Sequence, residues 1–154
     1  MARAIDVARC LVNLAVCEDE PDTLTHLRLQ KLLYYCQAWS LAKRDRPLFP
    51  EPIEAWSSGP IVIDIYRRFS DQGMVPIYPE SFDPEDESEI DPEESHFVVS
   101  VWEAYKGFSA SKLRDMTHEE DPWIQAREGY GPAQRCEVEI KPEAIRDYFL
   151  SGVS

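Results

Sequence analysis

Apolar residues follow a helical period from the start of the chain. Over residues 3–17 they cover the whole circumference of a helix except one narrow wedge, which holds Asp6, Arg9 and Asn13. So narrow a polar side is typical of a helix that is buried over most of its surface. We therefore expect a largely buried helix over residues 3–17.

The second helical pattern, over residues 27–44, has two apolar faces on nearly opposite sides. Thr25 is placed to cap its N-terminus. Two polar stripes separate the faces, one made of Gln30, Gln37 and Arg44 and the other of Arg28, Lys31 and Tyr35. A helix with two apolar faces packs between two layers. The pattern therefore predicts that residues 27–44 form the central helix of the domain.

The remaining pattern predicts short elements. We expect a strand at residues 53–57, a helix that begins at Pro60 and ends at Gly73, and a helix capped by Asp91 whose inner face carries Phe97, Val101, Ala104 and Phe108. Shorter helices should follow Ser109 and Asp121, a strand at 136–140 should pair with 53–57, and a helix at 142–150 should close the chain. The predicted fold is one mostly α domain over residues 1–154, with a minor two-stranded β element.

Composition fits that fold. The chain has 154 residues, of which 44% are hydrophobic, enough for a core that needs no disulfide or metal. The four cysteines, Cys10, Cys17, Cys36 and Cys136, form no CxxC pair, so we expect reduced core residues. The sequence shows no apolar run of membrane-spanning length and no signal peptide. We therefore expect a cytoplasmic protein.

The negative charge is concentrated in one segment. Sixteen Lys and Arg against 29 Asp and Glu give a formal charge of −13, and residues 80–94 hold nine of those acids and no base. We interpret about 79–94 as a flexible acidic connector. It is a solvated linker, a docking arm for a basic partner, or a decoy that imitates nucleic-acid phosphates. Direct nucleic-acid binding is not expected, because that role requires the opposite charge.

A search for catalytic or metal-binding patterns finds no assembled site. The three histidines are scattered, no phosphate-binding glycine loop occurs, and Thr117–Glu120 has the spacing of a capping box. A Cys36–His118 pair stays open, although Cys36 lies on an apolar stripe where its reactivity would fall. We therefore expect a protein that is not an enzyme and that needs no cofactor or metal.

Aromatic and cationic residues indicate a protein-binding surface instead. Trp, Tyr and Arg are the residue types that most often anchor interfaces. We place Lys31, Tyr35 and Arg28 on a polar edge of the central helix, and Arg67 and Arg68 on a solvent face. The candidate partner-binding residues are Arg28, Lys31, Tyr35, Trp56, Arg67, Arg68, His118 and Trp123. The two tryptophans could instead simply fill the core.

Three segments together resemble a known family. They are LRLQKLLYYCQAWSLA at residues 27–42, IEAWSSGPIV at 53–62 and SKLRDMTHEEDPWIQAR at 111–127. In their order and spacing they resemble the SocA-like antitoxin family, also called the Panacea domain, which occurs in bacteria and phages. The resemblance carries over to Leu29, Gln30, Lys31, Leu32, Leu33, Tyr34, Tyr35, Trp56, Gly59, Pro60, Leu113, Thr117, His118, Pro122 and Trp123.

The resemblance implies a helical, non-enzymatic antitoxin that neutralises a cognate toxin protein by direct binding. In one branch of the family it also implies an adaptor that delivers the toxin to the ClpXP protease. The alternative hypothesis is a phage or prophage accessory protein that binds a basic host factor through its acidic arm.

Overall fold

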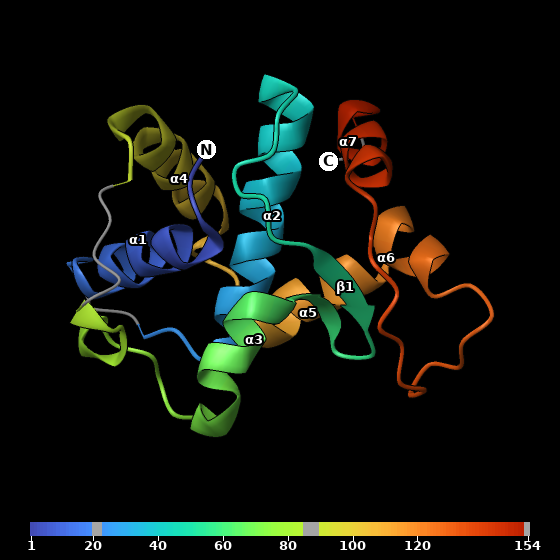
Figure 1. Cartoon of the computed structure of the whole chain (residues 1–154), viewed down its shortest axis with the longest axis horizontal. Coiled ribbons are helices and arrows are strands. Elements are labelled where there is room, and N and C mark those ends of the chain that lie inside the picture. Colours follow the sequence, from blue (N-terminus) through green and yellow to red (C-terminus); the bar gives the residue numbers. More distant parts are fainter. Residues whose placement is uncertain (20–22, 85–89, 153–154) are drawn as a thin grey trace.

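The helix α2 (His26–Arg44) stands at the centre of the molecule, with the other elements packed around it. In Figure 1, α1 and α4 lie on one side of α2 and α7 lies on the other. The computed structural model describes residues 1–19, 23–84 and 90–152. Its elements are α1 (Ala4–Val16), α2, β1 (Ile53–Trp56), β2 (Gly59–Val62), α3 (Ile63–Phe69), the 3₁₀ turns η1 (Ser70–Gln72) and η2 (Pro79–Ser81), α4 (Pro92–Tyr105), α5 (Ala110–His118), α6 (Asp121–Ala126) and α7 (Pro142–Leu150).

The predicted mostly α architecture with a small β element is confirmed, and so is the central position of α2. The helix contacts α1, α4, α5, α7 and β2, and nearly all of its residues are buried. Thr25 caps it as expected, because the Thr25 side chain accepts a hydrogen bond from the Arg28 amide. None of the described helices is long and apolar enough to cross a membrane.

One polar stripe of α2 fastens segments that are not helical. Gln37 accepts a bond from the Leu48 amide at 2.8 Å and donates to the Phe49 carbonyl at 2.8 Å. Seven residues earlier on the same stripe, Gln30 makes the same pair of bonds to both backbone groups of Val62, at 2.7 and 3.2 Å. The side-chain amides of Gln30 and Gln37 thus give these buried backbone groups the hydrogen-bond partners that a neighbouring strand would otherwise supply.

The β element differs from the prediction. β1 pairs with β2 in an antiparallel hairpin in which Trp56 lies opposite Gly59, so Pro60 belongs to a strand and α3 begins only at Ile63. Residues 136–140 are not a regular strand. They follow the other edge of β1 through two backbone bonds, from Ala55 N to Val138 O and from Ile140 N to Ile53 O. Because only two residues separate β1 from β2, closing the hairpin costs little chain entropy, which favours this pairing.

Two burial predictions also need correction. The inner face of α4 carries Glu94, Val98, Val101 and Trp102, whereas Ala104 is exposed and Phe97 and Phe108 are only half-buried. Trp102 turns inward because its indole N–H donates to Glu18 at 2.7 Å. Of the cysteines, Cys36 and Cys136 are buried, Cys10 is half-buried and Cys17 is exposed. The expectation of four core cysteines is therefore wrong for Cys17.

The described ends of the acidic segment are fixed to the fold. Asp91 caps α4 by accepting a bond from the Glu93 amide, and Phe82 is buried. Glu94 receives two bonds from the Arg44 guanidinium, at 2.8 and 3.0 Å, and a third from Arg46. The expectation of a flexible connector is therefore wrong for these described ends. Its most acidic stretch, residues 85–89, lies outside the described residues.

The Arg44–Glu94 pair predicts a specific loss of stability. Replacing Glu94 with Gln removes one of the two charge-assisted bonds to a largely buried guanidinium, and we expect a cost of about 2–3 kcal/mol in urea denaturation at pH 7. The bonds from Arg44 hold the pKa of Glu94 below its ordinary value. The stabilisation is therefore present above about pH 4.5 and is lost as the pH falls through the lowered pKa, so the variant and the wild type should converge in acid.

Glu93→Gln is the matched control, since Glu93 is 74% exposed and pairs only across the surface with Arg46. It should change the free energy of unfolding by less than about 1 kcal/mol. Equal losses for the two variants, or a loss at Glu94 that does not depend on pH, would contradict the assignment.

Candidate functional site

The three motif-bearing segments meet in one place. α2 contacts both β2 and α5, and α5 in turn contacts β2. Residues that are far apart in the sequence therefore assemble around the N-terminal half of α2. We call this assembly the motif cluster; its members are Lys31, Tyr35, Gly59, Thr117, His118, Glu120 and Trp123.

A fully buried lysine lies at the centre of the motif cluster. Lys31 Nζ donates to the Pro60 carbonyl at 3.2 Å. Gly59 leaves the room for it, because a Cβ on Gly59 would lie 2.6 Å from Lys31 Cε and 3.1 Å from Thr117 Oγ1. Burial lowers the pKa of Lys31 to about 7, and the nearby Arg114 adds to the effect. In the Gly-Pro motif, Gly59 thus leaves space for the Lys31 side chain, and the Pro60 carbonyl accepts its hydrogen bond.

The second part of the motif cluster is a stack of rings. His118 lies parallel to Trp123, with ring centroids 4.0 Å apart. The Trp123 indole N–H donates to the Trp56 carbonyl at 2.8 Å, which ties α6 to the hairpin. Burial lowers the pKa of His118, and the nearby Arg114 and Lys31 also lower it. His118 is therefore neutral at pH 7 and serves as a packing surface for Trp123.

The third part is a buried carboxyl. The Tyr35 hydroxyl donates to Glu120 Oε2 at 2.7 Å, and the Tyr35 ring stacks on Tyr105 at 4.4 Å. Burial raises the pKa of Glu120 to about 7, which the hydrogen bond from Tyr35 opposes. The interpretation of residues 117–120 as a capping box is wrong, because Thr117 lies inside α5 and its hydroxyl donates to the Arg114 carbonyl.

The cysteine considered as a nucleophile lies inside the fold. Cys36 is fully buried on α2, and burial raises the pKa of its thiol far above the ordinary value, which keeps it protonated and unreactive. In the part of the chain that the structure describes, no three His, Cys, Asp or Glu residues gather in a way that could hold a metal ion. The polar atoms of the motif cluster instead join α2, the hairpin and the α5–α6 junction.

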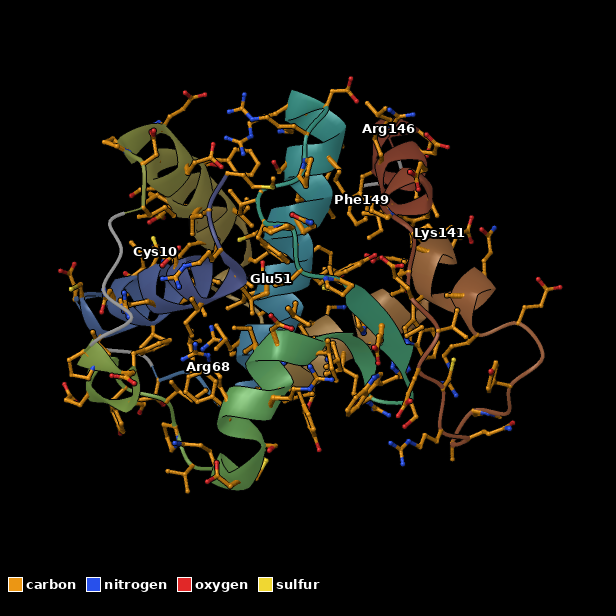
Figure 2. The ribbon with its side chains drawn as sticks, in the orientation of Figure 1. Cys10, Glu51, Arg68, Lys141, Arg146 and Phe149 are labelled. Carbon is orange, nitrogen blue, oxygen red and sulfur yellow. The ribbon has the colours of Figure 1, made fainter. Side chains whose placement is uncertain are left out.

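The structure separates the predicted site residues into three groups. Lys31, Tyr35, Arg28 and Trp123 are buried, Trp56 and His118 are half-buried, and Arg67 and Arg68 are exposed on α3. The expectation that the polar edge of α2 is exposed is therefore wrong. Each of its side chains reaches a distant segment instead: Arg28 donates to the Lys106 carbonyl at 2.8 Å, for example. Figure 2 shows Arg68 on α3, away from Lys141 at α7.

Sequence reasoning missed an apolar groove between α2, α4 and α5. Its volume is about 410 Å³. Its lining residues are Trp39, Lys43, Phe97, Ser100, Val101, Ala104, Tyr105, Phe108 and Met116. The available signal was the predicted inner face of α4, whose members Phe97, Ala104 and Phe108 all border this groove. The apolar spacing along α4 predicted a buried face, whereas Phe97 and Phe108 are half-buried and Ala104 is exposed at the groove.

Comparisons with known proteins match the chain to SocA-like antitoxins. Residues 29–124 match the family described as "Antitoxin SocA-like, Panacea domain". Antitoxin SocA of Caulobacter vibrioides (strain NA1000 / CB15N) is 40% identical over 67 residues, which is 44% of this chain and 35% of that protein. The match thus spans little more than a third of the length of this relative. No solved structure matches the chain.

The fit between Gly59 and Lys31 predicts that Gly59→Ala is strongly destabilising. The φ of Gly59, +114°, already disfavours any side chain, and the new methyl group would lie 2.6 Å from Lys31 Cε, so the fully buried lysine would have to shift. We expect a loss of about 3 kcal/mol in urea denaturation. Gly129→Ala is the matched control, with φ +91° but no atom within 4 Å of the added Cβ. It should cost about 1 kcal/mol, and equal costs would contradict close packing at Gly59.

The buried Glu120 predicts an unusual dependence on pH. Its folded pKa is about 7 and its ordinary value is 4.5, so between these values the folded state holds a proton that the unfolded state has lost. Stability therefore falls as the pH rises from 4.5 to 7 and does not recover above that window. Glu120→Gln keeps an acceptor for Tyr35 and removes the charge.

We expect Glu120→Gln to exceed the wild type by about 1–3 kcal/mol at pH 8 and by much less at pH 5, measured by urea denaturation at both values. Glu119→Gln, at the exposed neighbouring position, is the control and should differ little from the wild type at either pH. A Glu120→Gln variant that is less stable than the wild type at pH 8 would contradict the raised pKa.

Proposed function

The chain belongs to the SocA-like antitoxin family with a Panacea domain, and we propose that it binds a cognate toxin protein and neutralises it by direct contact. The observation that carries this proposal is the extent of the family match. Residues 29–124 include every member of the motif cluster. They also include α4 and all the residues that line the groove beside it. The named relative is an antitoxin, and the family match spans α2 through α5 of this chain.

Binding without catalysis is the second part of the proposal. Its support is that Lys31, Tyr35 and the His118 ring are held by contacts within the fold, while His118 Nε2 and Glu120 Oε1 are buried with no hydrogen bond among the described residues. Lys31 bonds to the hairpin, Tyr35 bonds to Glu120, and His118 stacks on Trp123. Residues that make these internal contacts stabilise the fold, and the partner then binds to the outer surface of that fold. Neutralising a toxin inside the cell requires both proteins to meet in the cytoplasm.

Delivery of the toxin to the ClpXP protease is a separate step of the proposal. Direct masking needs only a stable complex, whereas delivery needs the complex to reach the protease and the toxin to be consumed. The two are distinguished by the lifetime of the toxin: masking leaves it long-lived, and delivery shortens it only in cells that contain ClpXP.

The alternative, a basic host factor bound by the acidic arm, has weaker support. At the described end of that arm, Glu93 and Glu94 are already paired with Arg46 and Arg44. The acids that could still act as a lure lie mainly in residues 85–89. Replacing Glu85, Asp86, Glu87 and Glu89 by their amides should abolish binding to a basic host factor and leave toxin neutralisation intact.

The direct test is co-expression with the neighbouring reading frame of the native host. We expect that product to arrest growth alone, to be silent with this chain, and to co-purify with it at equal stoichiometry. As a control, the Gly59→Ala variant should rescue less in proportion to its lower folded population. Growth arrest that this chain fails to relieve, with no complex recovered, would contradict the antitoxin proposal.

A further inference from the structure

The groove between α2, α4 and α5 concentrates half-exposed aromatic side chains. Its walls include Trp39, Phe97, Tyr105, Phe108 and Met116, each only partly buried against the core. Large aromatic residues and methionine that are half-exposed around a hollow are the composition of an interface anchor. Its volume of about 410 Å³ lies in the range of pockets that enclose a few bulky side chains.

The walls are held in place before any partner arrives. The Trp39 indole N–H donates to the Tyr105 hydroxyl at 2.7 Å. Phe97 packs under the Arg44 guanidinium, 4.3 Å from the ring centroid, and Arg44 is itself fixed by its two bonds to Glu94. A preformed surface avoids the entropy cost of ordering side chains on binding.

The groove walls offer few free backbone groups for hydrogen bonding, which favours a helix as the bound segment. Its walls are side chains on helices, whose backbone groups are bonded within each helix. Ser100 also uses its hydroxyl internally, by donating to the Phe97 carbonyl at 2.6 Å. An extended segment would find no backbone partners here, whereas a helix satisfies its own backbone and needs only apolar contacts.

The charges at the groove mark the partner as acidic. Lys43 is exposed at one end, 5.3 Å from the Trp39 ring centroid. Most other surface cations are paired with carboxylates, but among the described residues Lys43 has no ion pair. On a chain of net charge −13, this lysine in the lining of an aromatic groove complements a carboxylate that flanks apolar anchors.

The other hollows are less suited to a helix. The hollow of about 590 Å³ near the N-terminus is bordered by charged groups that already pair with each other, among them Arg3 with Asp6 and Arg46 with Glu93. The groove of about 490 Å³ between α1 and α4 is lined by small and aliphatic residues such as Leu14 and Val99 together with polar ones such as Arg9, and has no aromatic wall.

We propose that this α2–α4–α5 groove docks an amphipathic helix of the toxin, which inserts bulky apolar side chains between Trp39 and Phe108 and presents a carboxylate to Lys43. The inference rests on the proposed antitoxin function and adds the contact surface and the chemistry of the partner segment. The motif cluster, in this assignment, stabilises the scaffold and does not touch the toxin.

The test is titration calorimetry of the full-length chain with the purified product of the neighbouring reading frame. Ala104→Arg fills the groove from an exposed position on α4 that tolerates a long side chain in a helix. We expect its affinity to fall at least about 30-fold. His96→Arg, also exposed on α4 and outside the groove lining, adds the same side chain as a control and should stay within about threefold.

Ser100→Arg is a second blocking variant, for the case that Ala104→Arg does not fold, as judged by circular dichroism and thermal melting. Lys43→Glu tests the charge and should weaken binding about tenfold at 0.05 M salt and less at 0.5 M. Lys141→Glu, at α7 on the other side of α2 (Figure 2), is its control and should leave affinity unchanged.

The outcomes separate the two proposals. A wild-type chain that binds while folded groove variants bind equally well overturns the groove and leaves the antitoxin function intact. A Lys43→Glu variant that binds more tightly overturns the acidic partner. A wild-type chain that does not bind the toxin at all overturns the proposed function and the inference that rests on it.

Discussion

The structure depends on one constraint: α2 is buried along most of its length, yet it carries polar residues throughout. A buried polar group without a partner is costly, so each of these side chains must find a bond elsewhere in the chain. Gln30 and Gln37 bond to backbone groups of extended segments, and Lys31 bonds to the Pro60 carbonyl. These bonds set where the chain runs after α2, and they bring the hairpin and the α5–α6 junction against the helix.

The same constraint explains why the family motifs fall where they do. The LQK sequence supplies the buried polar groups, the Gly-Pro sequence makes room for Lys31, and Thr117, His118 and Trp123 close the cluster from α5 and α6. The motifs therefore encode the scaffold. None of the aromatic residues that α4 adds to the groove belongs to a motif segment, but Trp39 and Met116 on its other walls do. The groove that we propose meets the partner is therefore built jointly by the motif helices and by α4.

Local signals made most of the helices predictable. The helices α1, α2, α4 and α7 follow from the spacing of apolar residues and from caps such as Thr25 and Asp91, because both act within a few residues. The β element was only partly predictable: residues 136–140 run antiparallel beside one edge of β1, as expected, but the hairpin partner at the other edge was missed because Pro60 was interpreted as a helix start. The exposure of Arg28, Lys31 and Tyr35 was wrong because their partners, Lys106, Pro60 and Glu120, lie far along the chain. The groove was missed because three elements build it together.

Hydrogen–deuterium exchange of the chain, alone and in complex with its toxin, tests the central claim most directly. The account predicts new protection along α4 and α5, around residues 97–108 and 110–118, together with little change at the hairpin and in the N-terminal half of α2, which the fold already protects. Protection that appears at the hairpin and α3 while α4 and α5 exchange as in the free chain would contradict the account. The toxin would then contact the motif side of the molecule, and the groove would have another role.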